Sequence, residues 1–451
     1  MATRDQLREL GLFDARAPRY TSYPPANHFN GQVSAETTAD WLRAVPAGER
    51  VSLYVHIPYC RRLCWFCACR TQGTSTDRPL VPYLHQLKQE LALIDATLPK
   101  DVVVSQIHLG GGTPTLLPPH MIRSLGKALR TFRPLADDLQ FSVEIDPTEV
   151  DQARIDALAD IGMTRASIGV QDFDPVVQDA IGRQQTFAQT RDVVNMLRAA
   201  GVKSLNMDIL YGLPHQTRER MSQSVQSVLS LSPDRVALYG YAHVPWMAKR
   251  QVMIPADALP DSETRLDLFD LARDLFLADG YQEIGIDHYA LPTDSLADAA
   301  KNGTMRRNFQ GYTDDTANVL IGMGASAISR YPQGFAQNLS TSSQYATAVE
   351  GGQLATSRGH AMSADDMLRS DMIEQLMCQF KLDLPALSAK HGVSLAGLID
   401  MTAPMRRRFA DHLAITNNVI QLDQSARLIA RLCAQEIDAY HMPEGRHSRA
   451  L

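Results

Sequence analysis

The sequence predicts an α/β fold, a partial (β/α)6 barrel of TIM-like type with an N-terminal arm and a mainly helical C-terminal domain. Short apolar, β-branched runs alternate with helix-like stretches between residues 51 and 241. Such alternation is typical of a parallel sheet. From about residue 361 the apolar residues take helical spacing instead. A complete barrel and a doubly wound sheet are the structural alternatives.

The length and composition indicate a globular protein of more than one domain. The chain has 451 residues, 45% of them hydrophobic and 21% charged, which is long for one ordinary core. We divide it into an arm (1–48), a barrel domain with an extension around its site (49–360) and a helical domain (361–451). The net charge of −6 gives no reason to expect a nucleic-acid partner.

The sequence shows no targeting or membrane segment. The start, "MATRDQLRELGLFDARAPRY", has no apolar core, and no run of about 18 apolar residues occurs. We therefore expect a cytoplasmic protein without a membrane partner, in which clustered cysteines more often bind metal or do chemistry than form disulfides. Cys378 and Cys433 lie alone in helix-like segments, and we expect them to be buried apolar side chains.

The arm, "APRYTSYPPANHF" included, has no clean period and reads as irregular chain lying on the barrel. A helix-like stretch after the fourth strand ends at Gly201, a good C-cap residue. A seventh apolar run, 281–291, is a further candidate strand. Six strands are expected, at 51–57, 103–109, 139–145, 165–170, 204–210 and 235–241.

The last ninety or so residues read as helices around a short hairpin at "NNVIQLD", in a winged-helix-like arrangement. A winged-helix-like arrangement is one that nucleic-acid-binding proteins use. The basic run "MRRRF" (405–409) is more often a solvated helix face, and the acidic total of the chain favours that interpretation.

Chemically unusual residues follow the expected strands. In a β/α barrel the loops after the strands build the active site, so these residues should converge on one rim. In strand order they are the cysteine loop, "GGGTP" (110–114), Glu144, Gln171 with Asp172, Asp208, and Ala242 with His243.

Four cysteines lie within ten residues, in the spacing C-x3-C-x2-C-x-C: Cys60, Cys64, Cys67 and Cys69. A structural zinc site would usually pair two C-x2-C knuckles, and no distant second pair is present. A tight loop of thiolates suits an iron–sulfur cluster. Three thiolates on a four-iron cluster leave one iron open to another ligand. A zinc-stabilised barrel without redox chemistry is the alternative.

The segment "CRRLCWFC" resembles the radical S-adenosylmethionine (radical SAM) enzymes. The resemblance implies that Cys60, Cys64 and Cys67 hold a [4Fe-4S] cluster. It also implies that the amino and carboxylate groups of S-adenosylmethionine bind the fourth iron, and that reductive cleavage gives a 5′-deoxyadenosyl radical. The fold implied is the partial barrel of the radical SAM type.

The resemblance extends over nearly the whole chain. The segments "YVHIPYC", "HLGGGTPTLL", "SVEIDP", "SIGVQDF", "NMDILYGLP", "YGYAHVP", "RRNFQGYT" and "GMGASAIS" are similar to the oxygen-independent coproporphyrinogen III oxidases, or dehydrogenases. A related group of haem chaperones generally lacks the "RYTSYP" arm and the last cysteine of "CAC", and this chain has both. Trp65 departs from the family, where Tyr is common.

The family's activity implies that the radical removes hydrogen from the β-carbon of a substrate propionate, which then loses carbon dioxide and an electron. Two such events turn coproporphyrinogen III into protoporphyrinogen IX in haem synthesis. The implied partners are this substrate, a flavodoxin or ferredoxin as electron donor, and an electron acceptor; we expect a monomer. The alternatives are a haem chaperone and an anaerobic haem-degrading methyltransferase.

Two carboxylates are informative without the resemblance. Glu144 and Asp208 lie in apolar strands, where an unpaired carboxylate is costly to bury. A ligand amine or ribose hydroxyl is a natural partner for each, and a salt bridge to a helix arginine is the alternative. The glycines at 110–112 allow close approach of the backbone to a ligand. His56 reads as a satisfied core histidine.

The resemblance implies a role for each further site residue, with two S-adenosylmethionine molecules per site. Tyr54, Gly111, Glu144 and Ile328 would serve the cluster-bound molecule. Cys69 and Tyr54 would be catalytic, although a buried thiol near the site is the alternative for Cys69. Arg19, Arg306 and Arg307 are candidates for the substrate carboxylates. The second molecule would be bound by Phe66, Gly112, Thr113, Gln171, Arg183, Asp208 and Ala242.

Overall fold

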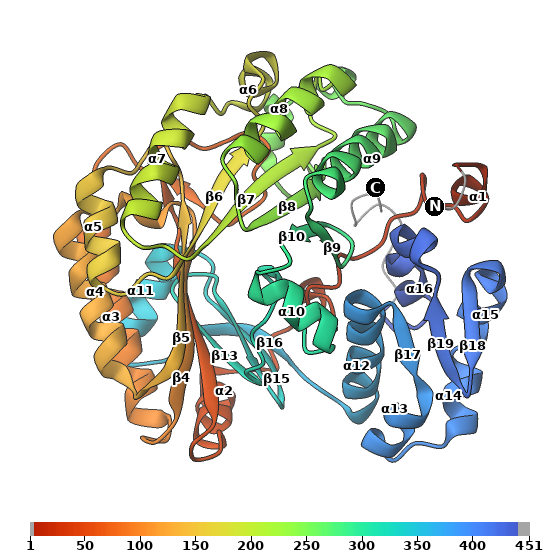
Figure 1. The fold of residues 1–451 in the computed structure, drawn as a ribbon. Helices are drawn as coiled ribbons and strands as arrows, with labels where there is room; N and C mark the ends of the chain where they lie inside the picture. Colours follow the sequence, from red (N-terminus) through yellow and green to blue (C-terminus); the bar gives the residue numbers. More distant parts are fainter. Residues whose placement is uncertain (1–3, 441–451) are drawn as a thin grey trace.

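The computed structural model describes residues 4–440, so residues 1–3 and 441–451, at the outer ends of the expected arm and helical domain, lie outside the described residues. Its centre is a curved sheet with six parallel strands in chain order, which confirms the partial barrel (Figure 1). These strands are β1 (Arg50–Ile57), β4 (Val103–Gly111), β5 (Leu135–Ile145), β6 (Arg165–Gln171), β7 (Ser204–Tyr211) and β8 (Arg235–Gly240).

Further strands extend both edges, giving a twelve-stranded sheet. Beyond β8 lies β10 (His288–Ala290), which is antiparallel to β8, and then β9 (Gln282–Ile284), which is antiparallel to β10. The seventh apolar run, 281–291, therefore forms a hairpin. Beyond β1 lies β13 (Val319–Met323), which is parallel to β1. The remaining strands of this edge are β14 (Ile328–Tyr331), β15 (Gly334–Asn338) and β16 (Thr356–Ala361).

Helices cover the convex face of the sheet (Figure 1). Side-chain caps start several of them: Asp151 accepts from the backbone N–H of Arg154, and Thr186 forms a capping box with Gln189. The helices between and after the parallel strands are α3 (Leu80–Thr97), α4 (Pro119–Phe132), α5 (Gln152–Asp160), α6 (Pro175–Ile181), α7 (Phe187–Ala199), α8 (Arg218–Ser230) and α9 (Ser262–Ala278).

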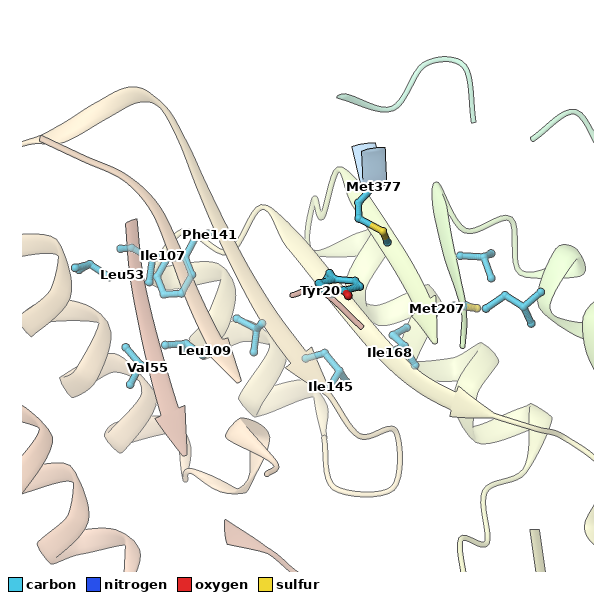
Figure 2. Close-up of a cluster of buried hydrophobic side chains, with 14 of the residues drawn as sticks. Tyr20, Leu53, Val55, Ile107, Leu109, Phe141, Ile145, Ile168, Met207 and Met377 are labelled. Atoms are coloured by element: carbon cyan, nitrogen blue, oxygen red, sulfur yellow. The ribbon is translucent and has the colours of Figure 1, made fainter. Parts of the chain in front are cut away.

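Alternating side chains separate the apolar core from the polar interior of the barrel. One set points to the helices and is buried, and Figure 2 shows Leu53, Val55, Ile107, Leu109 and Phe141 from this set. The intervening residues of the same strands line the concave face and are polar, for instance Ser52, Tyr54 and His56 of β1. The concave face therefore has the chemistry of a site.

The N-terminal arm is more ordered than expected. It contains α1 (Arg4–Glu9), the 3-10 helix η1 (Ala26–His28) and α2 (Ala35–Arg43), and Ser34 caps α2 through the backbone N–H of Thr37. The arm then runs between the barrel and the C-terminal helices. Arg431 Nε donates to the Pro18 carbonyl at 3.0 Å.

The C-terminal segment is mainly helical, and the expected hairpin at "NNVIQLD" is confirmed as β18 (Leu413–Thr416) and β19 (Val419–Leu422). Cys378 and Cys433 are buried, as predicted. Among the helices of residues 4–440, none combines the length and apolar character that crossing a bilayer requires. The other elements here are α12 (Ala364–Gln379), β17 (Lys381–Asp383), α13 (Leu384–His391), α14 (Leu395–Met401), α15 (Ala403–Arg408) and α16 (Ala430–Gln435).

Candidate active site

The cysteine loop is fixed at both of its ends. It leaves β1 through the short strand β2 (Tyr59–Cys60) and returns through β3 (Gln72–Gly73), which pairs with β2. The Gln72 N–H donates to the Pro58 carbonyl at 2.7 Å, and the Thr74 N–H donates to the Cys60 carbonyl at 2.9 Å. The first cysteine is thus held at the end of the first barrel strand, as the sequence predicts.

The thiols differ in environment. Cys64 is buried, Cys60 and Cys67 are half-buried, and Cys69 is exposed. Burial raises the pKa of Cys60 to about 11, although a hydrogen bond with Thr113 lowers it in part. A hydrogen bond from the Cys69 thiol lowers the pKa of Cys67 to about 6. Cys69 therefore contacts Cys67, one of the expected cluster ligands.

The donor set fits an iron–sulfur cluster. Across residues 4–440, no three His, Cys, Asp or Glu side chains are already gathered closely enough to hold a metal ion. The thiols nevertheless share one short loop, and thiolate is the ligand that such clusters take. Arg183 Nη1 lies 3.4 Å from Cys64 Sγ and places a positive charge beside this sulfur, which would stabilise a thiolate ligand.

The backbone of the glycine loop, residues 110–114, packs against the start of the cysteine loop. The Gly112 N–H donates to the Ile57 carbonyl at 2.7 Å, and the Thr113 N–H donates to the Tyr59 carbonyl at 2.8 Å. A Cβ at Gly112 would lie 2.6 Å from the Tyr59 carbonyl oxygen. Gly111 has φ of +110°, which favours glycine. These positions exclude a side chain and leave the loop close to the cysteines.

Glu144 lies at the end of β5 and faces the barrel interior. Its Oε2 accepts from the Gly111 N–H at 3.0 Å, and its Oε1 accepts from His108 Nε2 at 3.2 Å. Burial opposes ionisation, but the hydrogen bonds from His108 and Gly111 lower the pKa of Glu144. Its partners are a histidine and a backbone amide, and the alternative of a helix arginine is wrong.

Tyr54 and His56 lie on the interior face of β1. Tyr54 Oη is 3.0 Å from His56 Nδ1, and His56 Nε2 is 3.0 Å from the Arg70 carbonyl. His56 therefore has partners on both ring nitrogens, as expected of a satisfied histidine. The Tyr54 and His108 rings are 5.7 Å apart, which brings Tyr54 to the Glu144 side of the site.

Arg183 is a half-buried arginine of the site, with its side chain 11% exposed. Nη1 pairs with Asp146 Oδ2 at 3.2 Å, and Nη2 donates to the Gly169 carbonyl at 2.8 Å. Burial opposes its charge, yet Asp146 and Cys64 raise the pKa of Arg183. Gln171 adopts φ of +68°, uncommon for a residue other than glycine, and its amide lies near Gly169.

Asp208 faces the interior from β7. Its Oδ1 accepts from Asn206 Nδ2 at 2.8 Å, and its Oδ2 accepts from Ser167 Oγ at 3.3 Å. Burial raises the pKa of Asp208. Both partners are neutral, so the carboxylate keeps acceptor capacity for a hydroxyl group, and no arginine pairs with it within residues 4–440.

One glutamine joins two further expected residues. Gln251 Nε2 donates to the Phe66 carbonyl at 2.8 Å and to the Ala242 carbonyl at 3.0 Å. Ile328 lies on β14, two strands from β1, and packs against Gly322, which is paired with Tyr54. The fold thus brings residues from seven strands and loops to one concave face.

Sequence reasoning missed several residues of this site. His108 precedes Gly110 by two residues, so strand alternation places both on one face and could have found it. Asp146 follows Glu144 by two residues and has the same signal, whereas Gln251 has none, because it acts through contacts far along the chain. Arg306 and Arg307 are held by protein partners: Arg306 pairs with Glu374, and Arg307 pairs with Asp287.

Comparison with known families agrees with this geometry. Residues 54–228 match the radical SAM superfamily. An oxygen-independent coproporphyrinogen III oxidase of Paracoccus denitrificans is 53% identical over 451 residues, the whole of both chains. A protein of the same description from Cereibacter sphaeroides is 52% identical over 440 residues, 98% of each chain.

A solved structure matches over nearly the same extent. The coproporphyrinogen III oxidase of Escherichia coli, described as a radical SAM enzyme, superposes with a TM-score of 0.90 at 35% sequence identity. The match covers 94% of this chain and 98% of the other. The two proteins therefore share one fold over most of the chain.

Proposed function

The chain belongs to the family of oxygen-independent coproporphyrinogen III oxidases, and we propose which of its residues perform that family's reaction. The protein is a radical SAM oxidoreductase of haem biosynthesis. It oxidatively decarboxylates two propionates of coproporphyrinogen III to vinyl groups, giving protoporphyrinogen IX. The haem chaperone and the haem-degrading methyltransferase draw no support from the relatives found.

A [4Fe-4S] cluster and S-adenosylmethionine, when bound, supply the 5′-deoxyadenosyl radical that takes hydrogen from the propionate β-carbon. Cys60, Cys64 and Cys67 are the proposed cluster ligands. Their confinement to one loop held by β2 and β3 supports this assignment. Arg183 would stabilise the thiolate of Cys64 through the contact at 3.4 Å.

The observation that carries the assignment is the meeting of the glycine loop, the cysteine loop and Glu144. Gly112 binds the carbonyl that precedes the cysteine loop, and Gly111 binds Glu144. The ionised carboxylate of Glu144 thus lies beside the backbone of the glycine loop. An ammonium group would bind well at this position. We assign the first S-adenosylmethionine to Tyr54, Gly111, Glu144 and Ile328.

The second proposed S-adenosylmethionine would lie toward β6 to β8. Asp208 offers acceptor oxygens for hydroxyl groups, and Arg183 offers a guanidinium for a carboxylate. Two molecules per site is a proposal from the resemblance. The remaining residues assigned to this molecule are Phe66, Gly112, Thr113, Gln171 and Ala242.

Tyr54 and Cys69 are the proposed catalytic side chains. The Tyr54 hydroxyl is oriented by His56, and the exposed Cys69 thiol lies beside Cys67. Both would meet the reacting propionate, orient it and exclude water from it. Arg19, whose Nη2 donates to the Gly240 carbonyl at the end of β8, is retained as a substrate candidate. A flavodoxin or ferredoxin donor, the acceptor, the cytoplasmic location and the monomeric state stay predictions.

The test is an anaerobic assay of reconstituted protein with dithionite, S-adenosylmethionine, coproporphyrinogen III and an electron acceptor. Mass spectrometry should show loss of two carboxyl groups in the wild type and none in Cys64→Ala. Cys433→Ala, a buried cysteine remote from the loop, should retain product formation and serves as the matched control. An intact porphyrinogen with full cluster iron would contradict the proposal.

A further inference from the structure

A pocket continues the concave face of the barrel beyond β1. About 700 Å³ of empty space lies between its walls, and part of that space is open solvent. Residues 20–23 of the arm cover one side, and α12 and the hairpin of β11 (Arg306–Asn308) and β12 (Gly311–Thr313) form others. Its apolar and aromatic lining includes Phe309, Leu320 and Phe335. Among residues 4–440, none of those that we assign to S-adenosylmethionine lines this pocket.

Three arginines line this pocket, and two of them are committed to protein partners. Arg306 Nη1 donates to the carbonyls of Thr316 and Ala317 at 3.3 and 3.2 Å, and its Nε pairs with Glu374. These contacts fix the β11–β12 hairpin to α12. A ligand would have to compete with all of them for the guanidinium of Arg306.

Arg307 is committed in the same way. Its Nη2 pairs with Asp287 at 3.3 Å, and its Nε donates to the Arg19 carbonyl at 3.3 Å. Its guanidinium also lies 4.3 Å from the centre of the Tyr312 ring. Asp287 therefore balances the charge of Arg307 inside the protein, and the Arg19 carbonyl ties it to the arm, while its Nη1 is buried without a hydrogen-bond partner among residues 4–440.

Arg330 differs from both. Within residues 4–440 its guanidinium makes no hydrogen bond and no ion pair, and Glu374, Asp371 and Asp315 act on it only electrostatically. Burial lowers the pKa of Arg330, and Arg306 adds to the effect. Arg330 is half-buried in the pocket lining and its guanidinium lacks a protein partner among the described residues, so a carboxylate entering the pocket could pair with it.

The strand register joins Arg330 to the proposed active site. Arg330 pairs with Leu320 across β14 and β13, and Leu320 pairs with Ser52 of β1. Two residues back along β14 lies Ile328, about 7 Å away at the usual rise per residue. Ile328 and Arg330 therefore point to the same side of the sheet as Tyr54, and the pocket opens beside the place where the radical forms.

We propose that Arg330 anchors a propionate carboxylate of the tetrapyrrole, one that is not reacting in that turnover. The proposal rests on the proposed function and adds a specificity-determining residue to it. The substrate bears four carboxylates, and the chemistry consumes one at a time. A cationic anchor with aromatic walls beside the reaction centre holds the ring edge while another propionate reacts. Arg330 thus replaces Arg306 and Arg307 as the anchor.

The test compares the wild type with Arg330→Gln, Arg330→Lys and Arg358→Gln. Arg358 lies on β16 of the same sheet and donates to Gln337 at 2.8 Å, outside the pocket, so its variant is the matched control. Two quantities are measured: the KM for coproporphyrinogen III and the dissociation constant of coproporphyrin III from fluorescence titration. Melting temperature and iron content report folding, and Arg330→Lys keeps the charge if the glutamine variant folds poorly.

Arg330→Gln should raise both quantities about 10- to 100-fold, the loss typical of a charged hydrogen bond. The KM for S-adenosylmethionine should not change, Arg330→Lys should lie between, and Arg358→Gln should match the wild type. Equal values in Arg330→Gln and wild type would overturn the anchor. If the wild type makes no product but still binds coproporphyrin III more tightly than Arg330→Gln, the pocket stands and the proposed function falls.

Discussion

His108 of β4 and Glu144 of β5 face each other across neighbouring strands, with His108 Nε2 3.2 Å from Glu144 Oε1. The pair fixes the carboxylate beside the Gly111 amide and leaves it ionised. His108 has no assigned contact with a cofactor, so it acts by positioning Glu144.

Replacing His108 should weaken binding of S-adenosylmethionine more than it slows turnover. His108→Ala removes one of the two hydrogen bonds to Glu144, and we expect the KM for S-adenosylmethionine to rise about tenfold with kcat changed less than about threefold. His108→Gln, which keeps a donor, should recover part of the loss. An unchanged KM in His108→Ala would contradict the positioning role.

The glycine loop should not tolerate alanine at Gly112. A Cβ there would lie 2.6 and 2.8 Å from the carbonyl oxygens of Tyr59 and Ile57, which are backbone atoms and cannot move cheaply. We expect Gly112→Ala to lose about 1–3 kcal/mol in the free energy of unfolding and to incorporate less iron. Gly31→Ala, whose Cβ meets nothing within 4 Å, is the control.

Cys67 and Cys69 are two residues apart and should respond differently to serine. Cys67→Ser should lose cluster iron, measured by colorimetric iron assay and absorbance. Cys69→Ser should retain iron and S-adenosylmethionine cleavage while product formation falls at least about tenfold, because we propose that the thiol of this exposed residue contacts the substrate. Loss of iron in Cys69→Ser would instead make Cys69 a ligand.

Acid should remove the contribution of Asp314 to stability. Burial opposes its charge, but Arg235 and Ser295 hold the pKa of Asp314 at about 2. The unfolded value is about 3.9, so the stabilisation, about 2 kcal/mol, is complete above that pH and disappears as the pH falls toward 2. Urea unfolding of apo-protein should give a difference between wild type and Asp314→Asn that is constant from about pH 7 to 4 and shrinks below. A difference that grows with acid would contradict the assignment.

Strand patterning predicted the barrel because each parallel strand carries one apolar face and is followed by a covering helix. The helix α2 was missed because the prolines before it suggest irregular chain, although Ser34 and Thr37 form a capping box. Candidate ligands could be proposed from the sequence where a motif carries them, as with Cys60, Cys64 and Cys67. Arg330 could not, since its significance is the partner that it lacks, and only packing reveals that.

The central claim is that this site places a propionate β-carbon where S-adenosylmethionine is cleaved. The most direct measurement uses coproporphyrinogen III deuterated at the propionate β-carbons and follows 5′-deoxyadenosine by mass spectrometry. The account predicts deuterium in 5′-deoxyadenosine together with the divinyl product, and neither in Cys64→Ala. Product formation with 5′-deoxyadenosine free of deuterium would contradict it.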